Sequence, residues 1–154
     1  MAAERLSFNK GGCPMKKRLL YLLLPIVTLI LEILPYGAVC NFMRPATTDG
    51  VPAGHFRELY SYFDLTPFGY ANFAPLITAI LTVIVILFLV LYGFTGRQPL
   101  ARMAKNTVLV CAVISFGPLL LGIHFLSVVG VMISLSLIGE YLLLRRIIKT
   151  SEGV

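Results

Sequence analysis

Long apolar runs separated by short polar segments dominate the sequence. The first run starts at Leu19 and continues to about Phe42, the second covers residues 74–94, and the third, residues 107–144, has Glu140 as its only formal charge. Because the hydrocarbon core of a bilayer is about 30 Å thick, a helix that crosses it needs roughly 20 mostly apolar residues. The pattern therefore predicts four spans, at about 19–40, 74–94, 107–122 and 127–144.

The apolar block at 107–144 is long enough for two helices joined by a tight turn. Its flexible and polar residues near the middle are Gly122, His124 and Ser127, so we expect the turn there. A turn at Gly117-Pro118 would leave a third span of about ten residues, which covers only about 15 Å at helical rise. Pro118 is instead expected to kink the third span, and Pro25 the first.

The composition supports a membrane protein. Hydrophobic residues make up 58% of the 154 residues, charged residues only 13%, and the mean hydropathy is +0.88. Soluble domains are about 25% charged, and disordered chains have low hydrophobicity. These values exclude both classes, and the predicted fold is an all-α integral membrane four-helix bundle.

The basic residues indicate which side of the membrane each segment faces. Eleven of the thirteen Lys and Arg residues lie in three segments, 1–18, 95–106 and 145–154. The long loop at 41–73 holds only Arg44 and Arg57. Since positive residues stay cytoplasmic, the sequence predicts a multi-pass protein of the cell membrane with both termini and the 95–106 loop in the cytoplasm. Three separate basic clusters fit an anionic cytoplasmic leaflet, and we expect no nucleic-acid partner.

The start of the chain allows two interpretations. Met15-Lys-Lys-Arg18 before an apolar run resembles the beginning of a signal peptide, and Met15 is a second candidate for the first translated residue. Glu32 and the prolines inside the run favour a first span that is retained.

The outer loop is dense in aromatic residues, with seven between positions 56 and 73: Phe56, Tyr60, Tyr62, Phe63, Phe68, Tyr70 and Phe73. Four apolar positions share the i, i+3, i+4, i+7 spacing of one helix face: Phe56, Leu59, Tyr60 and Phe63. Residues 55–64 are therefore predicted to form an amphipathic helix in the outer interface. Two roles stay open: an aromatic belt at the lipid headgroups, or a docking surface where Tyr60, Phe63 and Phe68, beside Arg57, bind a membrane partner or a lipid.

Two acidic residues lie inside predicted spans, where an ionisable group is a functional hypothesis by default. Glu32 comes three residues before Pro35, so we place it in the last outer turn of the first span. It is expected to pair with a loop cation (Arg44, Arg57 or His55), to be a protonatable transport site, or to contact a partner subunit. Glu140, one turn before Arg145, is expected to reach the cytoplasmic interface.

The remaining motifs concern packing and chemistry. Gly130 and Ser134 form a small-xxx-small step on the fourth span, which favours close helix packing within the bundle or self-association. The three cysteines have no CxxC spacing and the two histidines are far apart, so neither a metal site nor a disulfide is expected. No catalytic or cofactor-binding motif appears, and the sequence predicts a non-enzymatic protein without a cofactor.

The stretch from Tyr62 to Leu76 (YFDLTPFGYANFAPL) resembles a segment of small four-span bacterial membrane proteins of uncharacterised function. This resemblance implies the fold and no activity. The chain is also similar to small multidrug-resistance exporters in its length, its four predicted spans and a Glu in the first span. It departs from them because Glu32 is placed toward the outside, the 41–73 loop is long and the charge bias is strong.

Two functions follow as expectations. The first is an accessory or structural membrane protein whose aromatic outer loop docks a membrane partner or a lipid. The alternative is a small homo-oligomeric transporter or channel-like protein that uses Glu32 as a proton-linked site.

Overall fold

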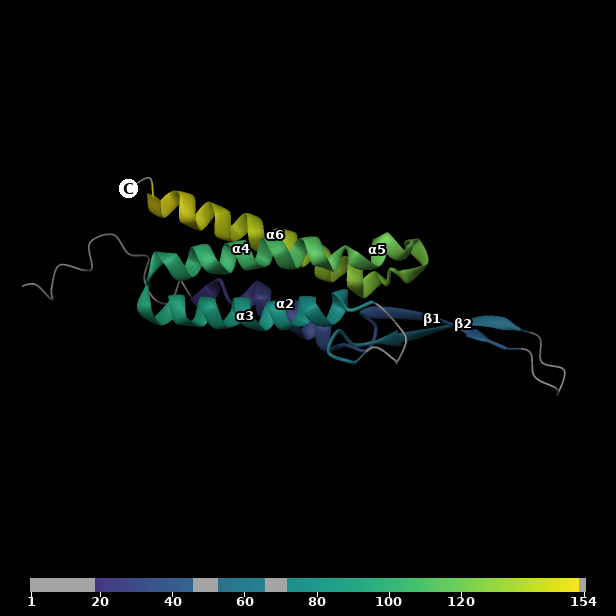
Figure 1. Ribbon diagram of the computed structural model, residues 1–154. Helices are drawn as coiled ribbons and strands as arrows, with labels where there is room; N and C mark the ends of the chain where they lie inside the picture. Colours follow the sequence, from purple (N-terminus) through teal and green to yellow (C-terminus); the bar gives the residue numbers. More distant parts are fainter. Residues whose placement is uncertain (1–18, 46–52, 66–71, 153–154) are drawn as a thin grey trace, which may run out of the picture.

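The computed structural model describes residues 19–45, 53–65 and 72–152. Its elements, in chain order, are α2 (Leu23–Ile33), β1 (Ala38–Arg44), β2 (Gly54–Tyr60), α3 (Ala74–Thr95), α4 (Gln98–Ser115), α5 (Gly117–Leu121), the 3-10 turn η1 (Ile123–Phe125) and α6 (Val128–Glu152). Helices α2, α3, α4 and α6 lie side by side, and the β1–β2 hairpin extends from one end of the bundle (Figure 1). Helix α5 and η1 lie at this same end, and the carboxyl end of α6 lies at the other.

Three helices are long and apolar enough to cross a membrane: Ala74–Thr95, Gln98–Leu121 across the α4–α5 break, and Val128–Lys149 within α6. The chain is therefore a small multi-span membrane protein, as its composition predicted. The predicted span at 74–94 coincides closely with α3. Helix α2 is a shorter apolar helix of 11 residues, so the described part of the chain supports three full-length spans and not a fourth.

The first predicted span is wrong beyond residue 33, because the helix ends before Pro35. Leu34 has an extended backbone (φ −63°, ψ 138°), which is the conformation that a following proline favours. The chain then enters β1 at Ala38. The residues that were expected to extend the span to residue 40 form instead a turn at 34–37 and the first part of β1.

The predicted amphipathic helix at 55–64 is also wrong. Gly54–Tyr60 is strand β2, paired antiparallel with β1 in a register that sets Phe42 opposite Phe56. Their rings stack with centroids 5.3 Å apart, and the Arg44 guanidinium lies 5.5 Å from the centre of the Phe56 ring. This cross-strand aromatic pair and the backbone ladder stabilise the strand over the helix that the local spacing suggested. The fold is thus mostly helical rather than all-α.

The connection between α3 and α4 is shorter than predicted. Gly96 adopts a left-handed conformation (φ 66°), its N–H bonds to the Tyr92 carbonyl, and α4 begins at Gln98 with Pro99 in its first turn. Glycine just after one helix and proline at the start of the next are strong boundary signals. The expected loop at 95–106 is therefore a tight turn followed by two turns of helix.

The turn between the last two spans is confirmed at 122–127. Gly122 has φ +121°, a conformation that favours glycine, and η1 follows it. Helix α4 stops at Ser115, and α5 restarts at Gly117 with Pro118 in its first turn. The expected kink at Pro118 is therefore a break between two helices, and the predicted span at 107–122 is divided by it.

Gly130 and Ser134 lie where helix α6 meets the rest of the bundle. A Cβ at Gly130 would come within 3.0 Å of the Gly37 carbonyl oxygen, so the absence of a side chain lets α6 approach the segment between α2 and β1. The Ser134 hydroxyl accepts a hydrogen bond from Ser115 of α4 at 3.0 Å and donates to the Gly130 carbonyl. In the described chain this small-residue step serves packing within the bundle.

Gly117 is a second close contact, and it yields a stability prediction. A Cβ at this position would lie 2.6 Å from the Ala74 Cβ at the start of α3, an atom with no side-chain freedom to move away. Gly117→Ala should therefore lower the free energy of unfolding by about 1–3 kcal/mol, the usual cost of overpacking. Thermal unfolding in mild detergent, followed by circular dichroism, measures the effect.

Gly54→Ala is the matched control, because no atom lies within 4 Å of a Cβ placed there. Equal melting temperatures for Gly117→Ala and Gly54→Ala would contradict the described α3–α5 contact.

Candidate functional site

Glu32 lies in the last turn of α2 and turns its carboxylate into the bundle. Its side chain is 0% exposed. The Thr82 hydroxyl of α3 donates to Glu32 Oε1 at 2.7 Å, and Thr82 also bonds to the carbonyl of Thr78 one turn earlier. The thiol of Cys111 on α4 lies 3.7 Å from the same hydroxyl. Three helices therefore contribute polar groups around this carboxylate.

Glu140, near the middle of α6, is also buried, and the expectation that it reaches the interface is wrong. It is only 1% exposed. The Thr28 hydroxyl of α2 donates to Glu140 Oε1 at 2.5 Å, and Thr28 also shares a 2.7 Å hydrogen bond with Ser136. The face of α6 that carries Glu140 packs on α2, so the side chain is enclosed although Arg145 is near in sequence.

Helix α2 links the two carboxylates. Thr28, the partner of Glu140, precedes Glu32 by four residues, and side chains at this spacing lie on the same face of a helix about 5–6 Å apart. Together with Thr28, Thr82 and Ser136 the two carboxylates form one polar cluster, which we call the carboxylate pair site.

Each carboxylate has one oxygen without a partner. Glu32 Oε2 and Glu140 Oε2 are buried and make no hydrogen bond in the described structure. Among the described residues, hydroxyl groups donate the hydrogen bonds to the two Oε1 atoms. Two of the loop cations expected for Glu32 have other partners: Arg57 donates to the Leu126 carbonyl at 2.9 Å, and the Arg44 guanidinium lies over the Phe56 ring.

The segment after β2 closes the site from the hairpin side. The Tyr62 N–H and the Ser61 hydroxyl both donate to the Glu32 carbonyl, at 2.9 and 3.0 Å, and so satisfy a free carbonyl at the end of α2. The Tyr62 side chain is 2% exposed, and burial raises the pKa of its phenol, so the group stays neutral. This loop fixes the hairpin to the helix that carries Glu32.

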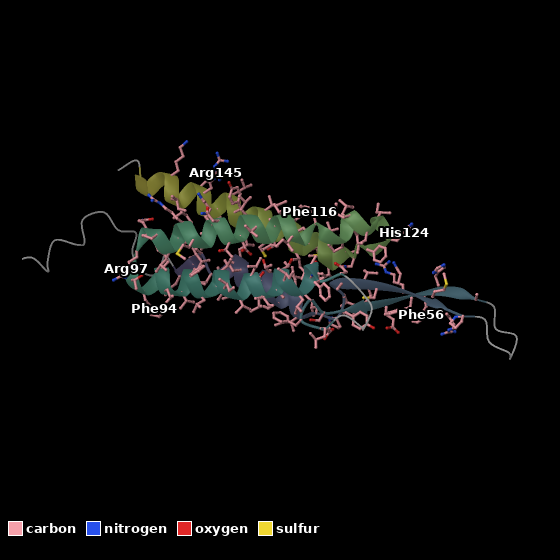
Figure 2. The ribbon with its side chains drawn as sticks, in the orientation of Figure 1. Phe56, Phe94, Arg97, Phe116, His124 and Arg145 are labelled. Atoms are coloured by element: carbon pink, nitrogen blue, oxygen red, sulfur yellow. The ribbon has the colours of Figure 1, made fainter. Side chains whose placement is uncertain are left out.

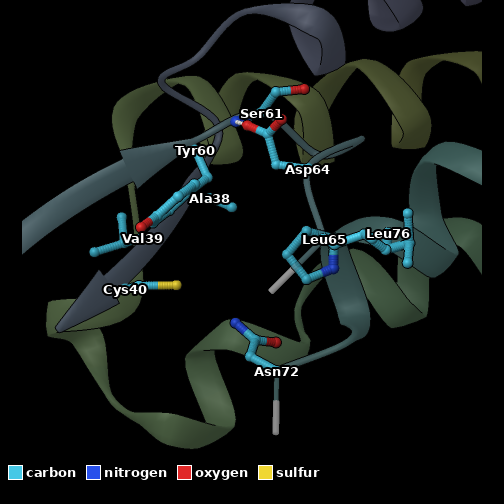
Figure 3. Close-up of a pocket in the computed structure, with 10 residues that line it drawn as sticks. Ala38, Val39, Cys40, Tyr60, Ser61, Asp64, Leu65, Asn72 and Leu76 are labelled. Atoms are coloured by element: carbon cyan, nitrogen blue, oxygen red, sulfur yellow. Dashed lines mark hydrogen bonds between the residues drawn. The ribbon is translucent and has the colours of Figure 1, made fainter. Parts of the chain in front are cut away.

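A small cavity of about 10 Å³ lies between the hairpin and the start of α3. The side chains of Cys40, Tyr60, Asp64 and Asn72 line it, and the Asp64 carboxylate accepts a hydrogen bond from the Ser61 N–H at 2.7 Å (Figure 3). Burial and the nearby Glu58 carboxylate raise the pKa of the Cys40 thiol. A protonated thiol is a weak nucleophile, and the volume admits little more than one water molecule.

The candidate residues of the outer loop lie apart from the carboxylate pair. Tyr60 donates to the Glu58 carboxylate at 2.5 Å, and this hydrogen bond raises the pKa of Tyr60 to about 12. Phe63 is 39% exposed. Arg57 lines a groove of about 310 Å³ with Tyr36, Leu59 and residues 127–129 at the start of α6. Phe68 falls outside the described residues, as do Pro67 and Tyr70.

Comparisons with known proteins identify no relative: no family model, no curated protein and no solved structure matches the chain. Within the described ranges, no group of three or more His, Cys, Asp and Glu side chains gathers in a way that could hold a metal ion. The carboxylate pair site and the hairpin are therefore the features of the molecule that bear on its function.

A spacing that recurs in two helices marks this site in the sequence. In α2 and in α6 a hydroxyl residue precedes the glutamate by four positions: Thr28 before Glu32, and Ser136 before Glu140. This spacing puts each hydroxyl and its glutamate on one helix face. Two such faces on apolar helices favour packing against each other, because neither is suited to lipid.

Thr28→Val tests the link between the helices. The substitution keeps the side-chain shape but removes the donor to Glu140, which leaves a second buried carboxylate oxygen unpaired. We expect the free energy of unfolding to fall by about 1–3 kcal/mol, measured by thermal unfolding in mild detergent.

Thr95→Val is the control, because Thr95 bonds to the carbonyl of Leu91 at an exposed position near the end of α3. A Thr28→Val protein as stable as Thr95→Val would contradict the hydrogen bond to Glu140.

Proposed function

We propose that the protein is a small ion-coupled transporter or channel-like membrane protein, with Glu32 and Glu140 as its proton-linked site. One observation carries the proposal: two carboxylates are fully buried in a bundle of apolar helices, and each keeps an oxygen without a partner. Ionisable groups inside a membrane are costly and mark ion pathways and proton relays.

A purely structural role accounts poorly for this arrangement. Buried charged groups are often replaced by apolar residues without loss of stability, so stability alone does not explain two of them. Glu32 also lies at the carboxyl end of α2, where the helix dipole adds negative potential. Both effects favour the uptake of a proton or a cation.

The two glutamates are staggered along the bundle. Glu32 is in the last turn of α2, next to the hairpin, whereas Glu140 bonds to Thr28, one turn or about 6 Å farther from the hairpin along α2. A proton that moves from one carboxylate to the other therefore advances toward the middle of the bundle, which is the arrangement expected of a relay. Assembly with further copies of the chain is part of this proposal.

The orientation remains the one proposed from the sequence, with the hairpin outside and both termini in the cytoplasm. Arg97 and Arg145 lie toward the opposite end of the molecule from Phe56 and His124 (Figure 2), and this separation of the basic residues supports it. At that end they are placed to meet an anionic leaflet.

The proposal predicts that proton uptake depends on both glutamates. When purified protein in proteoliposomes is exposed to a pH jump, the wild type should give transient currents on a solid-supported membrane. Glu32→Gln and Glu140→Gln, which keep the side-chain size but do not ionise, should reduce these currents to the level of empty liposomes.

Glu58→Gln, at an exposed position on the hairpin, is the control and should retain the currents. Equal currents from the wild type and both buried variants would exclude a proton-linked role for the pair.

The accessory function is a second candidate, supported by the shape of the outer loop. The hairpin extends past the helices (Figure 1), and its exposed apolar side chains include Met43, Phe56 and Leu59. Exposed aromatic and aliphatic residues of this kind are typical anchors for a partner. In this function, as in the first, the protein is proposed to be non-enzymatic.

For this candidate, we expect Phe56→Ser with Leu59→Ser to abolish the recovery of a stoichiometric membrane partner in mild detergent, while the amount of inserted protein stays constant. Leu65→Ser is the matched control, because Leu65 is 80% exposed and lies outside the strands. Mass spectrometry of the purified complexes measures the result, and unchanged recovery from the double variant would reject the hairpin as a docking surface.

A further inference from the structure

We infer that the groove between the hairpin and the start of α6 binds one phospholipid, with the lipid phosphate on Arg57 and an acyl chain along α6. The groove has a volume of about 310 Å³, at the lower end of the range for small-molecule sites. This inference goes beyond the proposed function and does not depend on the protonation of Glu32 or Glu140.

Hydrogen bonds hold the walls of the groove together. The Ser127 hydroxyl donates to the Gly37 carbonyl at 2.6 Å, which joins the start of α6 to the turn that carries Tyr36. Arg57 of β2 donates to the Leu126 carbonyl at 2.9 Å and so joins the hairpin to the residues just before α6. Because these bonds fix the walls in advance, a ligand does not have to order them when it binds.

The charge of the groove favours a phosphate. Arg57 and Leu59 lie two residues apart on one face of β2, and both line the groove. Glu58 projects from the other face of the strand, where it accepts a hydrogen bond from Tyr60. None of the described residues that line the groove is acidic, so the guanidinium is not neutralised there. A guanidinium has five N–H donors in a planar fork that matches the oxygens of a phosphate.

The position of the groove favours a lipid as the source of that phosphate. Val128 and Val129, which line the groove, are the first residues of a helix that is long and apolar enough to cross a membrane. Arg57 belongs to the hairpin, which extends past the helices (Figure 1). The groove therefore lies where the hydrocarbon of a bilayer meets the headgroups. Tyr36, at the edge of the groove, is half exposed and is of a residue type enriched at this depth.

An exposed apolar stripe continues from the groove along α6. Val128, Val131 and Leu135 have the i, i+3, i+7 spacing of one helix face, and their side chains are 79%, 42% and 62% exposed. On a membrane-spanning helix such side chains contact acyl chains. A molecule that carries both a phosphate and an acyl chain can contact Arg57 and this stripe together, which neither a free phosphate nor a neutral lipid can do.

Dioleoyl phosphatidylglycerol is the probe, because the phosphate is its one charged group. We expect native mass spectrometry of the full-length protein in mild detergent to detect one tightly bound molecule of this lipid per chain. Dioleoylglycerol has the same acyl chains without the phosphate, and glycerol 3-phosphate has the phosphate without the chains. Each should bind more weakly than the phospholipid. Arg57→Gln, which removes the charge, should weaken phospholipid binding roughly tenfold or more, as the loss of a charge-assisted hydrogen bond does.

Arg44→Gln is the matched control, because Arg44 lies on the same hairpin but does not line this groove, and the affinity should not change. Val128→Asp tests the inference even if Arg57→Gln fails to fold. An acidic residue suits the start of a helix, but its charge repels the phosphate, so binding should again fall roughly tenfold. Val128→Asn, which has the same size and no charge, should bind as the wild type does.

Three results would overturn the inference. The first is dioleoylglycerol or glycerol 3-phosphate that binds as tightly as the phospholipid. The second is a loss of affinity that is the same for Arg57→Gln as for Arg44→Gln, or for Val128→Asp as for Val128→Asn. The third is a dimer of lipid-free protein that added phospholipid does not dissociate, because a second copy of the chain would then occupy the groove.

Discussion

Inside a bilayer no water is available to hydrogen-bond a polar group, so each such group in the bundle needs a partner from the protein. Many of the hydroxyl groups meet this constraint through the carbonyl one turn earlier, as Thr28, Thr78, Thr82 and Ser134 do. Thr28 and Thr82 also reach across to a carboxylate on a neighbouring helix. The packing of α2 against α3 and α6 thus depends on the same atoms that hold Glu140 and Glu32.

This constraint also explains why the hairpin and the helices form one structure. The end of α2 leaves carbonyls without helical partners, and Ser61 and Tyr62 satisfy the one that belongs to Glu32. Tyr62 in turn fills space beside Gly37 and Ile133, where a side chain at position 37 would clash with its ring. The residues that follow β2 therefore form part of the wall around the buried pair.

The sequence predicted features that depend on local chemistry. The span at 74–94 follows from apolar length, and the turn at 122–127 from a glycine and its polar neighbours, all of which act within a few residues. The hairpin was not predictable in this way, because Phe56 pairs with Phe42, fourteen residues earlier, and a local helical spacing does not reveal such a pairing. The burial of Glu140 was not predicted for a similar reason. The sequence shows that Glu140 is close to Arg145, but it does not show that α2 covers the face of α6 on which Glu140 lies.

Helix α2 has a consequence for the lipid around the protein. Its 11 residues rise about 16 Å, whereas the 22 residues of α3 rise about 33 Å. Its outward side chains, among them Ile26, Ile30 and Ile33, are exposed as lipid-facing residues are. Acyl chains on this side meet half the apolar helix length that they meet along α3. A bilayer of ordinary thickness therefore has to become thinner beside α2, or the protein has to tilt, and either change brings the headgroups on that side closer to the depth of Glu32.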